Sequence, residues 1–189
     1  MSVAAAVSSG LHAAWLLARG RAEGLRYVEA DMAGAARSFW AAGLCLPAFV
    51  CLRLIGWTGS GMPPHATHVI AIDLLSYGAG WCGFAVLSHQ LVGAMGLAER
   101  WPRFIALWNW CNVVQYLLLV VFSIPGLLGA PALFDQVAQL FALGWALWLE
   151  WFAFRLTLGV SIVAAAGLVM VDVAIGVLLA AVSVALHAG

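Results

Sequence analysis

The sequence predicts an all-α membrane protein, a bundle of five transmembrane helices preceded by an N-terminal amphipathic helix at the membrane interface. Three observations predict this fold class. Hydrophobic residues make up 65% of the 189 residues and charged residues only 8%, whereas soluble domains carry about 25% charged residues. The mean hydropathy is +1.03. Five stretches are also long and apolar enough to cross about 30 Å of hydrocarbon, which takes about 20 helical residues.

Residues 1–36 are expected to form a cytoplasmic or interfacial segment ahead of the spans. Within this segment, residues 3–18 are rich in alanine, but two serines and a histidine make them too polar to cross the membrane. The apolar side chains recur every four residues and form one stripe on a helix, which is typical of a helix that lies in the membrane interface. The stripe consists of Val3, Val7, Leu11 and Trp15.

Residues 37–189 are expected to form the transmembrane domain. Pro47 lies inside the first span and predicts a kink there. Pro125 is expected to end the third span, because proline cannot donate the backbone hydrogen bond of a helix interior. The link between the last two spans is so short that they should form an antiparallel hairpin. The spans are expected at residues 37–57, 68–95, 104–124, 131–154 and 160–186.

The arginines predict the orientation in the membrane. The chain has arginine and no lysine, and cytoplasmic loops of membrane proteins carry an excess of these basic residues. Arginines lie ahead of the first span and in the connections after the second and fourth spans, whereas the loops after the first and third spans have none. We therefore expect a bacterial inner-membrane protein with a cytoplasmic N-terminus and a periplasmic C-terminus. The arginines that predict this are Arg19, Arg21, Arg26, Arg37, Arg100, Arg103 and Arg155.

Two charged residues are expected to pair near the outer membrane surface. Arg53 lies near the outer end of the first span, and Asp73 lies about a turn and a half into the second span from the same side. Because the two spans are antiparallel, both side chains reach a similar depth. We expect a structural ion pair, in which removal of one partner would leave a buried charge uncompensated.

A group of polar residues is expected to meet in the cytoplasmic half of the bundle. The second and fourth spans bring polar side chains to that depth, and on the third span such residues recur at every third position. The group could be a hydrogen-bonded network that holds the helices together, at about 0.6 kcal/mol per bond. It could also line a solvated cavity for a proton, a small solute or a lipid headgroup. The set is His89, Gln90, Asn109, Asn112, Gln115 and Glu150.

Asp172 is expected to stand apart from its neighbours. It lies near the middle of the fifth span and has no charged neighbour on its own helix. A carboxyl group at that depth has to be protonated, paired with a group on another span or turned towards another subunit. Asp172 is the best single candidate for a proton-linked role, with a neutral, hydrogen-bonded structural residue as the alternative.

The sequence has no pattern that indicates a metal, a cofactor or a nucleic acid. His65 and His68 form a lone HxxH pair, which is too little for a metal site. A basic stripe that could neutralise phosphates is missing. No cofactor is predicted, although contact of His89 or of the tryptophans in the third and fourth spans with a pigment or a quinone stays open. Membrane lipids and other membrane-protein subunits are the expected partners.

Three segments carry a resemblance to known proteins. Together they resemble small membrane proteins of alphaproteobacteria, and the layout of five spans after a cytoplasmic segment is similar to that of the Yip family, the Ypt-interacting membrane proteins. The chain lacks the long acidic or proline-rich N-terminal domain of eukaryotic Yip proteins. The resemblance implies a scaffold or membrane-organising role and assigns no functional residue. The segments are AWLLARGRAEGLRY (Ala14 to Tyr27), ARSFWAAGLCLPAF (Ala36 to Phe49) and RFIALWNWCNVVQ (Arg103 to Gln115).

These observations favour a non-enzymatic integral membrane scaffold or an accessory subunit of a larger inner-membrane complex. The alternative is a proton-linked small-solute transporter or channel that uses the intramembrane residues Asp172, Glu150 and His89. An enzyme that acts on lipids comes third, because neither a nucleophile paired with a base nor a metal cluster is evident in the sequence.

Overall fold

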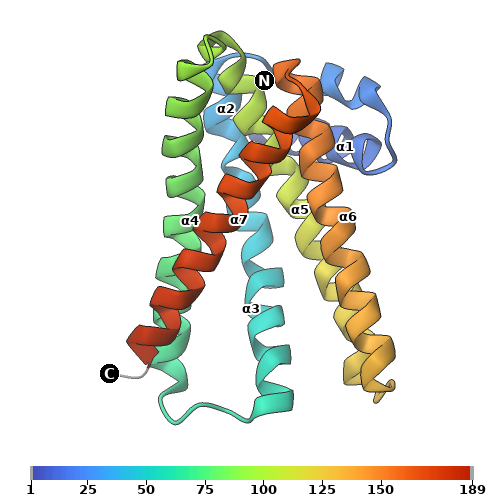
Figure 1. Ribbon diagram of the computed structural model, residues 1–189, viewed down its shortest axis with the longest axis vertical. Coiled ribbons are helices and arrows are strands. Elements are labelled where there is room, and N and C mark those ends of the chain that lie inside the picture. The colour runs from blue at the N-terminus through green and yellow to red at the C-terminus, as the bar shows by residue number, and fades with distance from the viewer. Residues whose placement is uncertain (1, 188–189) are drawn as a thin grey trace.

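The computed structural model describes residues 2–187, and within them it contains helices joined by short turns and no strand (Figure 1). Five helical stretches are long and apolar enough to cross a membrane, and a shorter apolar helix precedes them. The chain is therefore an all-α, multi-pass membrane protein, as predicted. The five stretches are Met32–Ser60, Ala66–Ala94, Ala98–Leu127, Ala132–Leu158 and Ile162–His187.

The first membrane helix begins before the predicted residue 37. Only Phe39 separates the helices α2 (Met32–Ser38) and α3 (Trp40–Ser60). The side chain of Asp31 caps α2, because it accepts a hydrogen bond of 2.7 Å from a backbone N–H in the first turn. This cap extends the helical stretch into the connector that the sequence pattern assigned to the N-terminal segment.

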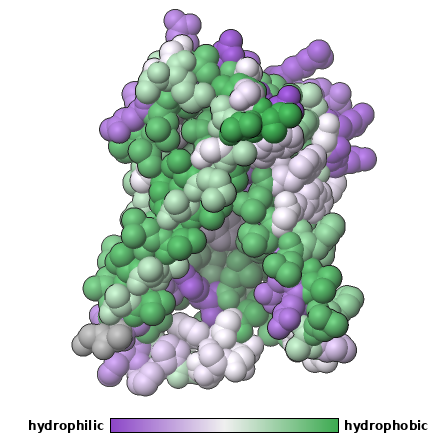
Figure 2. Space-filling model, in the orientation of Figure 1, coloured by the Kyte–Doolittle hydropathy of each residue, from purple (hydrophilic) through white to green (hydrophobic). Residues whose placement is uncertain are grey.

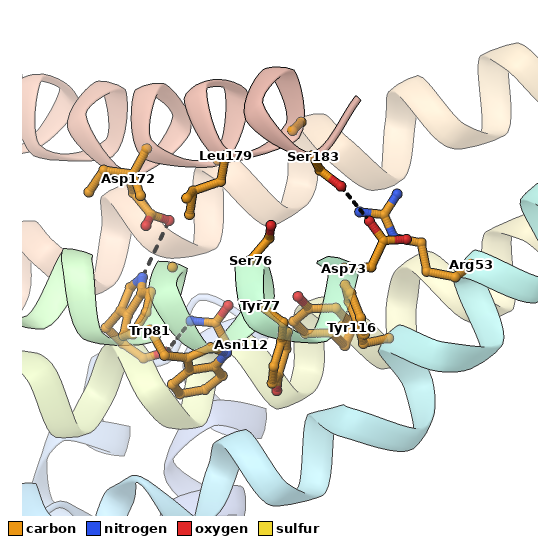
Figure 3. A pocket seen from close by; sticks show the side chains of 16 residues that line it. Arg53, Asp73, Ser76, Tyr77, Trp81, Asn112, Tyr116, Asp172, Leu179 and Ser183 are labelled. Atoms are coloured by element: carbon orange, nitrogen blue, oxygen red, sulfur yellow. Dashed lines mark hydrogen bonds and ion pairs between the residues drawn. The ribbon is translucent and has the colours of Figure 1, made fainter. Parts of the chain in front are cut away.

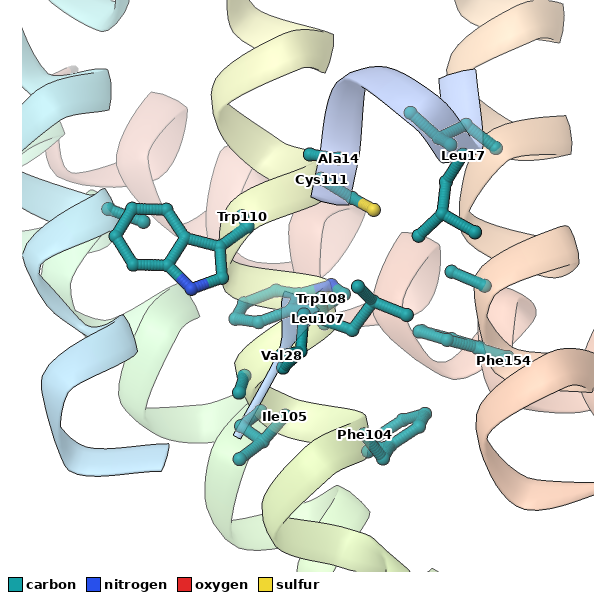
Figure 4. Close-up of a cluster of buried hydrophobic side chains, with 14 of the residues drawn as sticks. Ala14, Leu17, Val28, Phe104, Ile105, Leu107, Trp108, Trp110, Cys111 and Phe154 are labelled. Carbon is teal, nitrogen blue, oxygen red and sulfur yellow. The ribbon is translucent and has the colours of Figure 1, made fainter. Parts of the chain in front are cut away.

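The N-terminal helix α1 (Val3–Ala18) packs on the bundle through small side chains. The predicted apolar stripe lies on a neighbouring side of the helix and is less buried; Trp15, for example, is 55% exposed. The 3-10 helix η1 (Ala22–Tyr27) follows and lies against α1. In Figure 4, Ala14 and Leu17 share one hydrophobic core with side chains of the later helices. The buried face of α1 includes Ala6, Gly10, Ala13, Ala14 and Leu17.

The helices divide into two groups (Figure 1). One group is formed around α5, and the other consists of α4 and α7. α5 is central, because it packs against α6, α3, α1 and α2, whereas α4 packs mainly against α7. Although α3 and α4 are consecutive in the chain, each therefore has its main contacts with other helices, which leaves room for a cleft between the groups. The elements are α4 (Ala66–Ala94), η2 (Ala98–Arg100), α5 (Trp101–Leu127), α6 (Ala132–Leu158) and α7 (Ile162–His187).

The third span does not end at Pro125, contrary to the prediction. α5 continues through this proline to Leu127, and the next turn is held by a hydrogen bond of 3.0 Å from the Ala130 N–H to the Pro125 carbonyl. A proline removes one backbone donor, and membrane helices tolerate this loss when local adjustments satisfy the freed backbone groups.

The fourth span also runs further than predicted, to Leu158, where Gly159 ends it. Gly159 has φ +66°, a left-handed conformation that glycine adopts without steric penalty. The Arg100 guanidinium donates a hydrogen bond to the Leu158 carbonyl, so it satisfies one of the free acceptors at the helix end. Only residues 159–161 link α6 to α7, and the two helices are in contact, which confirms the predicted hairpin.

Candidate functional site

Polar side chains line a cleft of about 240 Å³ inside the bundle. Four helices, α3, α4, α5 and α7, contribute to its walls, and Figure 3 shows their side chains pointing into the space between them. Aromatic rings occupy much of the remaining wall. The polar lining residues are Arg53, Asp73, Ser76, Tyr77, Asn112, Tyr116, Asp172 and Ser183.

The predicted pair of Arg53 and Asp73 lies at one end of this cleft. Arg53 Nε is 3.4 Å from Asp73 Oδ2, as expected for residues at equal depth on antiparallel neighbours. The Asp73 side chain is only 3% exposed, whereas that of Arg53 is 42% exposed. Asp73 also accepts a hydrogen bond of 2.7 Å from the Ser183 hydroxyl, and His187 Nε2 lies 3.7 Å away. The buried carboxylate is thus compensated from two other helices.

Asp73, Ser183 and His187 are the residue types of a hydrolytic triad, but their geometry differs from one. In a triad the imidazole takes the serine proton on one ring nitrogen and is held by the carboxylate on the other. Here Ser183 donates directly to Asp73, and the same His187 Nε2 faces both the Ser183 hydroxyl at 3.2 Å and the Asp73 carboxylate. The arrangement stabilises a buried carboxylate and does not activate a nucleophile.

Asp172 lies at the other end of the cleft and is paired across the bundle with Glu150 of α6. The two carboxyl groups are close enough to influence each other. The indole Nε1–H of Trp108 donates to Asp172 Oδ2 at 3.4 Å. Glu150 is 3% exposed, and its Oε1 has no hydrogen-bond partner within the described residues. One of the three alternatives, contact with a group on another span, is thus observed for Asp172.

The predicted inner cluster does not form as a unit. Glu150 meets Asp172 rather than His89 and Gln90, which are both exposed on α4. His89 packs edge-on against the Trp101 ring, with 4.8 Å between the ring centroids. The spacing along the chain did not give the direction in which α4 presents these residues.

The polar stripe on α5 also divides among different neighbours. Residues three apart on a helix differ in direction by about 60°, and α5 is surrounded by other helices. The Asn109 amide therefore donates to the Ser38 hydroxyl at 2.7 Å, and Gln115 donates to the Ala146 carbonyl at 2.9 Å. Asn112 alone of the three lines the cleft, and its amide donates to the Trp108 carbonyl.

A second, wider cavity of about 550 Å³ adjoins the cleft near the α3–α4 loop. The two cavities share Arg53, Asp73 and Ser183 in their walls. His65 and His68 line the wider cavity. In Figure 2, polar colour is visible inside the hollow at this end of the molecule, framed by hydrophobic surface. Together the cavities lead from the α3–α4 loop to Asp172.

Three phenylalanines close the cleft beyond the carboxyl pair. Phe84, Phe104 and Phe154 come from α4, α5 and α6 and have 0%, 0% and 1% exposure. Their ring centroids lie 4.6 to 6.1 Å apart. On its own helix, each phenylalanine lies about one turn closer to the α6–α7 end of the bundle than the nearest cleft-lining or carboxyl residue. Buried aromatic rings therefore lie between the carboxyl pair and the α6–α7 end of the bundle.

Ser183 and His187 were not predicted as site residues, although the sequence carries a signal for Ser183. It follows Asp172 by eleven residues, which is about three helical turns, so both side chains lie on one face of α7. Leu179 lies between them on the same cleft wall. A search for polar residues at this spacing in an otherwise apolar span would have found the pair.

Within residues 2–187, no three His, Cys, Asp or Glu side chains lie together so that they could hold a metal ion. Trp108 and Trp110 are 5% and 3% exposed and pack in the protein core, whereas Trp148 is exposed and stacks on Phe152.

Comparison with models of protein families, with curated proteins and with solved structures finds no match for this chain. The similarity of its layout to the Yip family stays a prediction.

Proposed function

We propose that this protein is a proton-linked transporter or channel for a small solute, with Glu150 and Asp172 as its proton-binding site. The observation that supports this most is the position of Asp172 at one end of a polar cleft, with the buried Glu150 beside it. Ionisable residues inside a membrane bundle are typical of proton relays and of ion or substrate pathways.

The chemistry of the pair follows from electrostatics. Two like charges 4 Å apart repel by about 4 kcal/mol in a medium with an effective dielectric constant near 20. Adjacent carboxyl groups away from water therefore hold one proton between them instead of ionising together. No N–H or O–H donor within the described residues reaches Glu150 Oε1, so a proton on the pair is what can satisfy it. Binding and release of this proton would couple the pair to a solute.

The proposed orientation places the N-terminus in the cytoplasm of a bacterium and the C-terminus in the periplasm. Every arginine except Arg53 lies in the α1–α2 segment, near the α4–α5 connection or near the α6–α7 link. These parts share one end of the molecule in Figure 1, and that end is cytoplasmic by the positive-inside rule. The cleft then opens towards the periplasm.

The experiment uses purified protein in liposomes that enclose a pH-sensitive dye. Four probes of different charge are added outside: pyruvate, choline, alanine and glucose. We expect at least one probe to move protons across the membrane, and the variant Glu150→Gln/Asp172→Asn to lose this movement. Asp135→Asn is the matched control, because Asp135 lies on α6 outside the cleft and should keep it.

A conservative variant tests whether the double variant loses proton movement only because it fails to fold. Asp172→Glu keeps a carboxyl group at the position and should retain proton movement at a reduced rate. The proposal is wrong if no probe moves protons with the unaltered protein, or if the double variant moves them equally fast.

A second candidate function, that of an accessory subunit, is favoured by a groove on the outside of the bundle. This groove, of about 630 Å³, lies between α3, α5 and α6 and is mostly apolar, but Ser123, Gln136 and Gln139 also line it. Side-chain amides in membrane helices are commonly satisfied by a neighbouring helix. Purification from native membranes in mild detergent should then yield a partner, and Gly56→Trp, which fills the groove, should lose it. A solitary 20 kDa monomer would count against this function.

A further inference from the structure

We infer that the cleft binds the carboxylate group of a small organic acid, and that Arg53 is the residue that recognises it. This inference deepens the proposed function, because it names the class of solute. Binding can nevertheless be measured without transport, so the two can fail separately.

The Arg53 side chain is partly exposed and lines both cavities. Arginine presents five N–H donors in a planar fork that fits a carboxylate with two parallel hydrogen bonds. The shortest contact of the guanidinium with Asp73 is that of Nε with Oδ2, at 3.4 Å. Within residues 2–187, Nη1 and Nη2 donate no hydrogen bond to a protein group, and the side chain is 42% exposed. The fork is thus available to a solute.

The guanidinium is also held in place from two sides. Asp73 binds it through Nε, and the Phe49 ring centroid lies 5.3 Å from its Cζ atom, which is within the range of cation–π attraction. A fixed guanidinium loses less conformational freedom on binding than a mobile one, which favours affinity. This arrangement of carboxylate, guanidinium and ring positions an anion-binding group at the junction of the two cavities.

The charge that a solute meets on its way in also favours an anion. Besides Arg53, the wider cavity presents three imidazoles, those of His65, His68 and His187. Its one carboxylate is that of Asp73, which is already engaged by Arg53 and Ser183. An anion therefore meets donors and a cation, whereas a cationic solute would meet Arg53. A single fork suits a singly charged carboxylate better than a phosphate dianion.

Size and charge balance also bear on the class of solute. The cleft of about 240 Å³ lies below the ~300–1,000 Å³ of pockets for drug-sized ligands and the adjoining cavity of about 550 Å³ lies within that range, so the space beside Arg53 admits a small organic acid. Asp172 and Ser183 are about 16 Å apart along α7 at about 1.5 Å per residue. The anion beside Arg53 and the proton on the Glu150–Asp172 pair therefore occupy separate sites. One anion and one proton together are electrically neutral.

The test is calorimetric titration of the purified full-length protein with pyruvate and with its neutral analogue pyruvamide. We expect pyruvate to bind and pyruvamide to bind at least about tenfold more weakly, since charge-assisted hydrogen bonds carry the difference. Laurate tests whether the carboxylate comes from a membrane lipid instead. Binding of laurate without binding of pyruvate would overturn the assignment to a small acid.

Variants locate the site. The double variant Arg53→Gln/Asp73→Asn removes both charges, so it leaves no buried charge uncompensated, and should bind pyruvate about 10- to 100-fold more weakly. Arg53→Lys keeps the charge without the fork and should give an intermediate loss. Arg155→Gln is the control, because Arg155 lies in the last turn of α6, outside both cavities.

The inference is overturned if pyruvate and pyruvamide bind alike, if neither binds, or if the double variant keeps the affinity of the unaltered protein. Circular dichroism and gel filtration establish that the variants are folded. If choline or glucose moves protons in liposomes and pyruvate does not bind, the carboxylate assignment fails and the proposed function stands. If pyruvate binds at Arg53 and no probe moves protons, the carboxylate assignment stands and the proposed function fails.

Discussion

Gly10 lets the N-terminal helix lie close to α5, and alanine at this position should loosen that contact. A Cβ atom there would lie closer than 3.0 Å to the Trp110 ring, whereas ordinary contacts are 3.4–4 Å. Trp110 is 3% exposed, so its ring has little space to turn into, and overpacking such a site costs about 1–3 kcal/mol. Since 1.4 kcal/mol is a tenfold change in an equilibrium constant, the undocked population of α1 should rise about 5- to 150-fold.

Limited proteolysis with trypsin measures this population. Arg19 and Arg21, directly after α1, are exposed, and cleavage of an ordered segment proceeds through its open form. We expect Gly10→Ala to be cut there faster by the factor above. Gly144→Ala is the matched control, because a Cβ atom at Gly144 meets no heavy atom within 4 Å.

Equal cleavage rates for Gly10→Ala, Gly144→Ala and the unaltered protein would refute the reasoning. A double-variant cycle tests the cause. Leucine in place of Trp110 leaves room for the methyl group, so adding Gly10→Ala to Trp110→Leu should change the rate by less than about twofold. A full effect in that background would show that the indole ring is not the reason.

Three further predictions concern the helix ends, the ion pair and the topology. Gly159→Ala should lower the thermal stability in detergent by about 1–2 kcal/mol, because φ +66° is strained for alanine; an unchanged melting temperature would contradict this. Arg53→Gln should destabilise by about 3 kcal/mol, since it leaves the buried Asp73 without its cation, and Asp73→Asn by less, because Arg53 is half-exposed; thermal unfolding that ranks the two variants in the opposite order would exclude this. A reporter enzyme fused after Gly189 should be active in the periplasm, and cytoplasmic activity would refute the proposed orientation.

The fold could be predicted because its causes lie within single segments. The length and apolarity of each span, and the glycine and proline turns between them, are local properties. The Arg53–Asp73 pair could also be predicted from the sequence, because the two residues lie on consecutive antiparallel helices joined by a short loop. Only depth matters for such a pair, and depth can be counted along the chain.

The carboxyl pair could not be predicted in the same way. Whether Glu150 meets His89 or Asp172 depends on the rotation of α4, α6 and α7 about their own axes. That rotation is set by packing between helices, such as the contacts of α4 with α7. In an almost uniformly apolar span the hydrophobic pattern does not mark an inward face, so the sequence lacks the amphipathic signal that settles this question in soluble helices.

The docking of α1 was missed for a related reason. The large apolar residues Val3 and Trp15 suggested the contact face, whereas the observed contact uses small residues that let two helices approach closely. In membranes, packing of small side chains drives helix association more than the burial of large ones, and the same rule applies to this helix on α5.

The block of Phe84, Phe104 and Phe154 has an electrical consequence. A polar cleft that admits water conducts, so the transmembrane voltage falls mainly across the dry layer of aromatic rings rather than along the cleft. A potential of 100 mV is worth about 2.3 kcal/mol for each elementary charge that crosses it. Under the proposed function, a proton that entered through the cleft would reach Asp172 almost without crossing the field. Nearly all of the voltage dependence of its transfer would then belong to the passage beyond the three rings.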